Sequence, residues 1–329
     1  MTLPTRPRGT TGMEITRVGL GAWAIGGGGW KHGWGSQDDE ESVASIVAAV
    51  ERGINWVDTA PVYGLGHSEE VVGKALKALP EKDRPYVFTK VGLVGDGPSN
   101  VMAEASVRRE VQDSLRRLGV ERIDLYQVHW PPTDGTPLGD YWATMLALRD
   151  EGLVRAVGMS NHDCDQLTAA EAVGHVDSLQ PPFSPINRAA AADVIPWCAE
   201  HGTGVIVYSP MQSGLLTGAM TEERVRSLPE DDWRCRDAEF TGDALRRNLA
   251  LADALRPVAD RHGVPVAAVA VAWTLAWDGV TGAIAGARRP DQIDGWLPAA
   301  ELDLDEKDLD EIASAIEETG AGAGPSRPG

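Results

Sequence analysis

Four ionisable side chains follow one another along the chain at or near the ends of short apolar segments. Asp58 ends the segment INWVD, Lys90 ends YVFTK and His129 ends LYQVH, while Tyr63 lies five residues after Asp58 in TAPVYGLG. If the three segments are neighbouring parallel strands, their carboxyl ends meet at one rim and bring the four groups together. The alternative is a set of separate structural ion pairs and a capped loop.

These side chains suit proton transfer to a carbonyl oxygen. An ammonium beside a phenol favours the phenolate, so we expect Lys90 to lower the pKa of Tyr63. Such a phenol can give a proton to a carbonyl oxygen and take it back in the reverse reaction. Asp58 would keep Lys90 charged and in place, and His129 would donate a hydrogen bond to the substrate oxygen. Only six of the 30 basic residues are Lys, which favours a specific need for an ammonium at position 90.

Later segment ends predict a cradle for a ligand. Hydroxyl and amide groups suited to a carboxamide occur at Ser160, Asn161 and Gln180. Each of these could equally be an ordinary turn or helix cap. Tyr208 offers a flat face to a heteroaromatic ring, and Ser209 and Ser213 with nearby backbone N–H groups could hold phosphates.

The last apolar segment, ending GAIAGARRPDQ, predicts an anion site. Gly286 lets a ligand approach the backbone, and Arg288 and Arg289 follow at an expected helix start. In a chain of formal charge −19, paired Arg residues there indicate anion binding. The alternative is a solvated helix start.

Tryptophans cluster near the first and fourth segments, and four of them could form an apolar substrate pocket: Trp23, Trp30, Trp34 and Trp130. Packing is the alternative reading of scattered Trp residues. The GGGG run at 26–29 has no Lys-Ser/Thr after it, so it is not a P-loop. No metal-binding motif is present, and we expect no metal.

Eight short segments rich in Val, Ile and Tyr recur, and longer stretches with helical spacing of apolar residues lie between them. Short apolar segments that alternate with helices are typical of parallel strands in crossover units. The segments are Val18–Trp23, Ile54–Ala60, Tyr86–Gly92, Ile123–Trp130, Val154–Asn161, Val176–Ser184, Gly204–Pro210 and Thr281–Arg288. Helical patterns cover Asp39–Arg52, Val101–Leu118 and Asp243–His262. Eight units predict a single-domain (β/α)8 TIM barrel, with an open doubly wound sheet as the alternative.

Two segments depart from this repeat. Met211–Gly242 is a long loop after the seventh strand, either a lid over a site or a surface insertion. The end of the chain from Thr319 reads TGAGAGPSRPG, which predicts a disordered, flexible tail at 319–329 after a barrel domain at 1–318.

Composition excludes several classes of protein. Of the 329 residues, 43% are hydrophobic and 24% charged, which fits a globular chain with a large core. No run of about 18 apolar residues exists, and no apolar stretch follows the N-terminal Arg residues as in a signal peptide. The net charge of −19 disfavours nucleic-acid and membrane partners. Three widely spaced cysteines suggest no disulfide framework, and we expect a cytoplasmic protein.

Seven stretches together resemble the aldo-keto reductase family, in family order from about Gly19 to Ile293. They read VGLGAWAIGG, INWVDTAPVYGLGHSEEVVGKAL, VFTKVG, RRLGVERIDLYQVHW, VRAVGMSN, VIVYSPMQSGLLTG and AIAGARRPDQI. The combination is highly specific and covers most of the chain. It looks most like the microbial general aldo-keto reductases and the related potassium-channel β-subunits.

The resemblance implies a (β/α)8 barrel without a Rossmann domain. It implies a nicotinamide cofactor, usually the 2′-phosphorylated form, so that we expect NADPH/NADP+, with NADH possible. It implies a catalytic tetrad of Asp58, Tyr63, Lys90 and His129, with Tyr63 as the proton donor. The cofactor contacts it implies are Gly21, Ala22, Trp23, Asp58, Ser160, Asn161, Gln180, Tyr208, Ser209, Pro210, Met211, Ser213, Gly214, Gly286, Arg288 and Gln292.

One departure from the family pattern lies where related members often carry a Glu-Asn pair that recognises adenine. Here these positions are Gly295 and Trp296, and Trp296 could stack on the adenine instead.

The resulting hypothesis is an oxidoreductase that reduces a small aldehyde or ketone with NADPH. The first alternative is a cofactor-binding, redox-sensing regulatory subunit with slow or no turnover. The second is a cofactor-free isomerase or aldolase that uses Lys90 as a Schiff-base amine.

Overall fold

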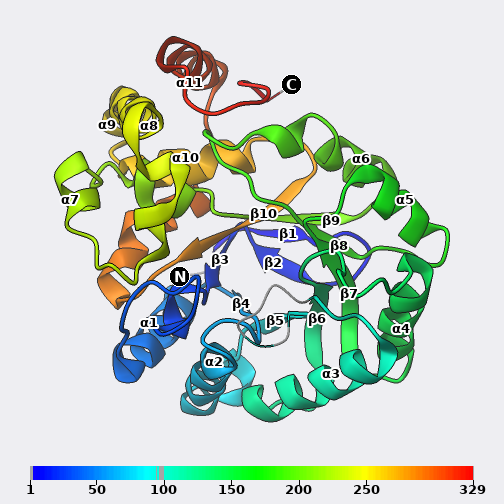
Figure 1. Ribbon diagram of the computed structural model, residues 1–329. Coiled ribbons are helices and arrows are strands. Elements are labelled where there is room, and N and C mark those ends of the chain that lie inside the picture. The colour runs from blue at the N-terminus through cyan, green and yellow to red at the C-terminus, as the bar shows by residue number, and fades with distance from the viewer. Residues whose placement is uncertain (1–2, 94, 96–99, 329) are drawn as a thin grey trace.

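Eight parallel strands close into a barrel in the computed structural model, which describes residues 3–93, 95 and 100–328. Helices surround the strands (Figure 1). The strands are β3 Val18–Gly21, β4 Trp56–Asp58, β5 Tyr86–Val91, β6 Ile123–Val128, β7 Val154–Ser160, β8 Ser178–Gln180, β9 Gly204–Tyr208 and β10 Val280–Gly286. Each falls within or overlaps one of the eight predicted segments. The pairing of β10 with β3 closes the barrel and excludes the open sheet.

The helices lie between successive strands or after the last one. They are α1 Asp39–Glu51, α2 His67–Ala78, α3 Glu104–Leu118, α4 Leu138–Asp150, α5 Cys164–Glu171, α6 Val194–His201, α7 Glu222–Arg226, α8 Gly242–Ala254, α9 Arg256–His262, α10 Val266–Leu275 and α11 Glu306–Thr319. The single helix expected over 243–262 is two helices, α8 and α9. Pro257 follows the break, where it cannot donate the backbone hydrogen bond that would continue α8. No helix in the described part of the chain is long and apolar enough to cross a membrane.

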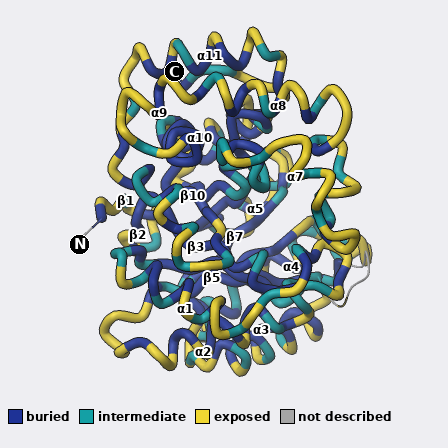
Figure 2. The backbone as a smooth tube through the Cα atoms, turned by 90° about the vertical axis from the view of Figure 1, so that its left-hand side faces the viewer, coloured by how far each residue is buried: buried dark blue, intermediate teal, exposed yellow. Residues whose placement is uncertain are grey.

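The core has two parts. A large apolar layer packs between the strands and the helices, and Figure 2 shows buried backbone along the strands and α10. A smaller cluster fills the barrel interior with Trp56, Phe88 and Leu125 among its members. Gly19 has to be glycine here, because a Cβ atom would lie 2.1 Å from the Trp56 ring.

An antiparallel hairpin that the sequence did not reveal covers the amino-terminal end of the barrel. It pairs β1 Thr5–Pro7 with β2 Glu14–Thr16. Met13 and Ile15 enter the interior apolar cluster, and Trp56 Nε1 donates a hydrogen bond to Thr16 O at 2.8 Å. The hairpin therefore shuts the end opposite the carboxyl ends of the strands.

The end of the chain packs against the barrel, which corrects the expectation of a disordered tail. Ala323 N donates to Ile186 O at 3.2 Å, and Arg188 N donates to Ala323 O at 3.0 Å. Gly322 permits this approach, because a Cβ atom there would lie 1.7 Å from Ile186 O. The glycines that suggested flexibility instead allow close backbone contact.

Candidate active site

A cavity of about 890 Å³ lies at the carboxyl ends of the strands. Its wall includes every predicted site residue except Lys90, which lies buried beside it. The segment after β9 also contributes to the wall, with Thr217, Met220, Arg224 and Arg234. Of the two readings of Met211–Gly242, a lid over the site therefore fits the structure.

Asp58, Lys90 and Tyr63 form a continuous polar contact. Lys90 Nζ lies 2.5 Å from Asp58 Oδ1 and donates to Thr59 O at 3.0 Å. The same ammonium lies 3.3 Å from the Tyr63 hydroxyl oxygen. The ends of β4 and β5 position the first two side chains, and the left-handed backbone of Gly64 (φ 63°) turns the chain just after the tyrosine.

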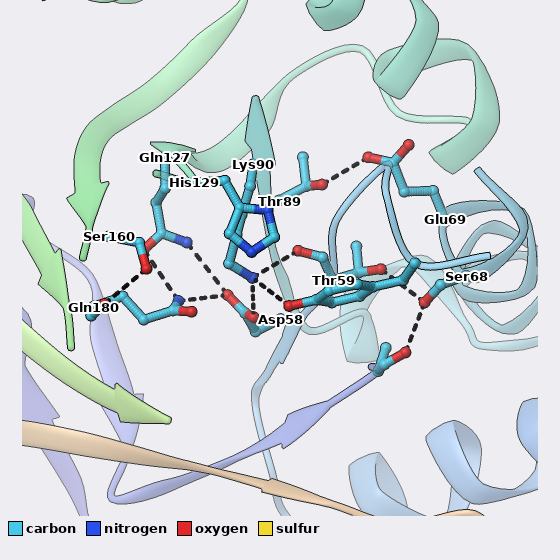
Figure 3. A network of polar contacts seen from close by, with 12 residues as sticks. Asp58, Thr59, Ser68, Glu69, Thr89, Lys90, Gln127, His129, Ser160 and Gln180 are labelled. Atoms are coloured by element: carbon cyan, nitrogen blue, oxygen red, sulfur yellow. Dashed lines mark hydrogen bonds and ion pairs between the residues drawn. The ribbon is translucent and has the colours of Figure 1, made fainter. Parts of the chain in front are cut away.

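Two amides hold the other oxygen of Asp58, as Figure 3 shows. Gln180 Nε2 donates to Asp58 Oδ2 at 2.9 Å, and Gln127 Nε2 donates to it at 3.3 Å. Gln180, expected at the carboxamide of a cofactor, thus also orients the carboxylate. Gln127 was missed, although a Gln in an apolar strand two residues before His129 was a usable signal.

His129 lies beside the phenol, with the two ring centroids 5.8 Å apart and nearly perpendicular. Burial, and to a lesser extent the charge of Lys90, lowers the pKa of His129 well below its usual value. The imidazole is therefore neutral at physiological pH and can donate from one ring nitrogen only.

The prediction that the pKa of Tyr63 is lowered beside Lys90 was wrong. Burial raises the pKa of Tyr63, and Asp58 adds to the rise, while Lys90 opposes it without outweighing it. Burial also lowers the pKa of Lys90, but attraction to Asp58 and Tyr63 is stronger and the net pKa is raised. The resting pair is therefore a neutral phenol beside an ammonium.

The residues predicted to face a carboxamide already bond to one another. Ser160 Oγ donates to Gln180 O at 2.7 Å. Asn161, at a left-handed φ of 61°, donates to His129 O at 3.0 Å and accepts from the Tyr208 hydroxyl at 2.9 Å. These bonds fix the ring of Tyr208 and the amide of Asn161 in the cavity wall.

The loop after β9 has the backbone expected of an anion-binding site. Ser209, Gln212, Ser213 and Gly214 have φ values of 57°, 44°, 52° and 103°, and all but Gln212 line the cavity together with Pro210 and Met211. Left-handed backbone can turn N–H groups toward a concavity, but Gln212 N and Gly214 N here already donate to Ser209 O and Met211 O. The predicted phosphate contacts Ser209 and Ser213 lie at the cavity wall.

Arg288 lies further along the same wall, where its guanidinium contacts another loop. Its Nε donates to Gln37 Oε1 at 2.6 Å, and its other two nitrogens donate to Trp34 O and Ser36 O. Its backbone N donates to Gln292 Oε1 at 2.7 Å. Arg288 therefore ties the loop that precedes α1 to the end of β10.

Trp296 and Arg289 complete this end of the cavity. Trp296 is 2% exposed, and its indole donates to Gly286 O at 3.2 Å. It therefore supports the cavity wall at Gly286 and offers little free ring surface in this structure. Arg289 is largely exposed and pairs with Asp291 at 3.2 Å.

Aromatic rings surround Tyr63, as the proposed substrate pocket requires. Trp30 lies 6.1 Å and Trp23 6.3 Å from the Tyr63 ring centroid, and Trp34 contacts Trp23 edge-on at 5.5 Å. Trp130 is 46% exposed at the cavity wall.

The predicted cofactor contacts line one cavity. Asn161, Gln180, the Tyr208 ring, the loop after β9 and Arg288 all line this cavity, where they could hold an extended nicotinamide dinucleotide. Among the residues described, no three His, Cys, Asp or Glu side chains come together as metal ligands would.

Comparisons with known proteins show which family the chain resembles. A model described as the aldo/keto reductase family matches residues 17–317. The chain is 36% identical over 314 residues to aldo-keto reductase YhdN from Bacillus subtilis, covering 94% of this chain and 92% of the relative. It is 33% identical over 329 residues to the NADH-specific methylglyoxal reductase of Escherichia coli, covering 94% and 98%. The glycerol dehydrogenase AKR11B4 structure from Gluconobacter oxydans matches with a TM-score of 0.86 and 36% identity, covering 98% of both chains.

The expected relation to channel subunits is also found. A probable voltage-gated potassium channel subunit beta from Arabidopsis thaliana is 28% identical over 310 residues, covering 89% of this chain and 90% of the relative.

Proposed function

The chain belongs to the aldo/keto reductase family, a family of oxidoreductases, and from this premise we propose that it reduces an aldehyde or ketone to an alcohol with NADPH. The observation that carries the proposal is the buried Asp58–Lys90 pair, whose ammonium lies 3.3 Å from the Tyr63 hydroxyl oxygen at the cavity wall.

When bound, the nicotinamide supplies the hydride. Tyr63 gives its proton to the carbonyl oxygen that becomes the alcohol, and Lys90 stabilises the phenolate that remains. Asp58, held by Gln127 and Gln180, keeps the ammonium in place. The neutral His129 donates a hydrogen bond to the carbonyl oxygen. Tyr63 and His129 thus act at the carbonyl oxygen, and Lys90 and Asp58 act through Tyr63.

The protonated state of Lys90 argues against Schiff-base chemistry. A Schiff base forms from a neutral amine with access to the substrate. The Lys90 side chain is buried, its pKa is raised, and its nitrogen contacts Asp58, Thr59 O and Tyr63.

The choice of NADPH rests on Arg288, whose guanidinium lies at the cavity wall near the end of β10. An arginine can bind a 2′-phosphate with two parallel hydrogen bonds. NADH is the alternative cofactor, since one relative is named NADH-specific.

The test follows nicotinamide absorbance with purified protein, NADPH or NADH, and a panel of small aldehydes, for the wild type and Tyr63→Phe. We expect aldehyde-dependent NADPH oxidation that the variant loses while still binding the cofactor. Full activity of Tyr63→Phe would remove the proton-donor role.

The second candidate is a redox-sensing regulatory subunit, favoured by the channel-subunit relative. It predicts tight cofactor binding with little turnover and a stable protein partner. Fast turnover of simple aldehydes without a partner in a pull-down would count against it.

A further inference from the structure

A stack of three aromatic rings connects Tyr63 to the segment between β9 and α8. The Trp23 indole lies 6.3 Å from the Tyr63 ring at an interplanar angle of 25°. The Trp233 indole lies 5.4 Å from Trp23 at 19°. Trp23 lines the cavity and Trp233 does not, so Trp233 supports Trp23 from behind.

The neighbouring residues connect the same stack to the loop after β9. Arg234 lies over the Trp34 ring at 4.4 Å, and Trp34 meets Trp233 edge-on at 6.0 Å. The guanidinium also pairs with Asp232, whose side chain is 1% exposed, at 2.7 Å. Its third contact is a hydrogen bond to Ser213 O at 3.3 Å.

Backbone contacts fix this segment across the loop that carries the tryptophans. Trp233 N donates to Gly33 O at 3.3 Å. Arg236 donates to Lys31 O, also at 3.3 Å. The segment is therefore attached both to the loop after β9 and to the aromatic wall.

We propose that Trp233 and Arg234 are positioning residues that couple the cofactor loop to the substrate wall. Trp233 holds Trp23 nearly parallel to Tyr63, and Arg234 links that wall to Ser213. The inference rests on the proposed reductase function and specifies its substrate class. The edge-on indoles of Trp23 and Trp34 in the cavity wall, with Arg234 already paired with Asp232, fit flat, uncharged carbonyl compounds such as aromatic aldehydes.

Steady-state kinetics with benzaldehyde and with a small aliphatic aldehyde test the role of Trp233. We expect Trp233→Ala to raise the KM for benzaldehyde about three- to tenfold, the effect of losing one aromatic pair. The KM for the aliphatic aldehyde, kcat and the cofactor Kd should change less. Trp233→Phe should restore most of the benzaldehyde KM.

Calorimetric titration of NADP+ tests the coupling through Arg234. Arg234→Met should raise the cofactor Kd about three- to tenfold and also raise the benzaldehyde KM, because one residue contacts both regions. Trp197→Ala is the control, since Trp197 stacks on His201 on the outer surface. Thermal unfolding checks that each variant is folded.

Two results would overturn the proposal. One is an unchanged benzaldehyde KM in Trp233→Ala, and the other is an unchanged cofactor Kd in Arg234→Met. If the wild type turns over no aldehyde, the proposed function fails, and near-UV circular dichroism of the stacked indoles decides the coupling. A change on NADP+ addition that Arg234→Met abolishes supports it, and the same change in the variant contradicts it.

Discussion

Asp58 Oδ1 and Lys90 Nζ lie 2.5 Å apart, and both side chains are almost fully excluded from solvent. Removal of one partner from a buried ion pair leaves an uncompensated charge, at a cost of about 3–5 kcal/mol. We therefore expect Lys90→Met to lower the free energy of unfolding by that amount. We also expect a loss of kcat of about 100-fold or more, because the Tyr63 phenolate loses its neighbouring cation.

Urea unfolding and the aldehyde assay measure the two effects. Lys74→Met is the matched control, since Lys74 forms an exposed ion pair with Asp39 at 2.7 Å and should change neither quantity appreciably. Unchanged kcat in Lys90→Met would contradict the role of the ammonium.

The pH dependence of the two reaction directions follows from Tyr63. Reduction uses the protonated phenol, whose pKa burial raises above its usual 10. The rate of reduction should therefore stay level through neutral pH and fall only in strong alkali, while alcohol oxidation should increase with pH. Profiles of kcat/KM in both directions test this expectation.

The pKa of His129 predicts how the rate of reduction depends on pH below neutrality. Burial lowers its pKa well below 6.5, so the imidazole stays neutral as the pH falls through 6. An acid limb near pH 6.5 that disappears in His129→Gln would show that the imidazole is protonated in the working enzyme.

Arg288 should decide between the two cofactors. If its guanidinium binds the 2′-phosphate, Arg288→Met should raise the KM for NADPH about 10- to 100-fold and leave the KM for NADH nearly unchanged. Arg116→Met is the control, because Arg116 is exposed on α3. Equal loss with both cofactors would indicate instead that Arg288 acts through its contacts with Gln37 and the loop before α1.

The sequence predicted most of what positions the site, because buried parallel strands have a local signature. The carboxyl ends of β4, β5 and β6 follow from the apolar segments before Asp58, Lys90 and His129. The sign of the Tyr63 pKa shift could not be predicted from the sequence. Residue spacing shows that a cation lies near the hydroxyl, but it does not show how far the hydroxyl is buried from water. Trp233 was also missed, since its stacking on Trp23 joins residues far apart in sequence.

Short or glycine-rich segments were the other source of error. The strands of the N-terminal hairpin have three residues each, too few to show alternation. The end of the chain has the composition of a flexible tail, yet its backbone carbonyl groups accept hydrogen bonds from the Arg188 side chain. Local composition does not reveal contacts made by a distant partner.

These tail contacts predict that removal of residues 320–329 destabilises the fold. Arg188 is 4% exposed and donates to Ala321 O at 3.0 Å and Gly324 O at 3.2 Å. Truncation removes the acceptor of Arg188 Nε and leaves one Nη with Pro185 O and Ile186 O, so the free energy of unfolding should fall by about 2 kcal/mol. Chemical denaturation measures it. Arg327→Ala, which removes only exposed ion pairs, is the control, and equal stability of the truncated and full chains would contradict the prediction.

Replacement of Arg8 is expected to stabilise the fold, unlike removal of the end of the chain. It enters the barrel floor from the hairpin, is fully buried, and has no hydrogen-bond partner at any of its three guanidinium nitrogens. The charge of Arg8 is stabilised by the Phe88 ring, whose centroid lies 5.1 Å away, and by attraction to Asp177 and Asp58. Burial outweighs that attraction and lowers the pKa of Arg8 to about 9. The pKa of Arg8 is lower in the folded protein than in the unfolded chain. Below about pH 9 the folded protein therefore holds a buried charge that costs free energy, so the charged side chain opposes folding at neutral pH.

Arg8→Met should therefore raise the free energy of unfolding, by about 1–4 kcal/mol, as replacement of buried charges by apolar side chains does elsewhere. Arg6→Met in the same hairpin is the matched control. Arg6 donates to Val280 O at 2.7 Å and Leu275 O at 3.2 Å, so its loss should destabilise by about 1 kcal/mol. If Arg8→Met is more stable but has a reduced kcat, the positive charge of Arg8 contributes to catalysis through its electrostatic effect on Asp58. A destabilised variant would mean that attraction to the two carboxylates exceeds the cost of burial.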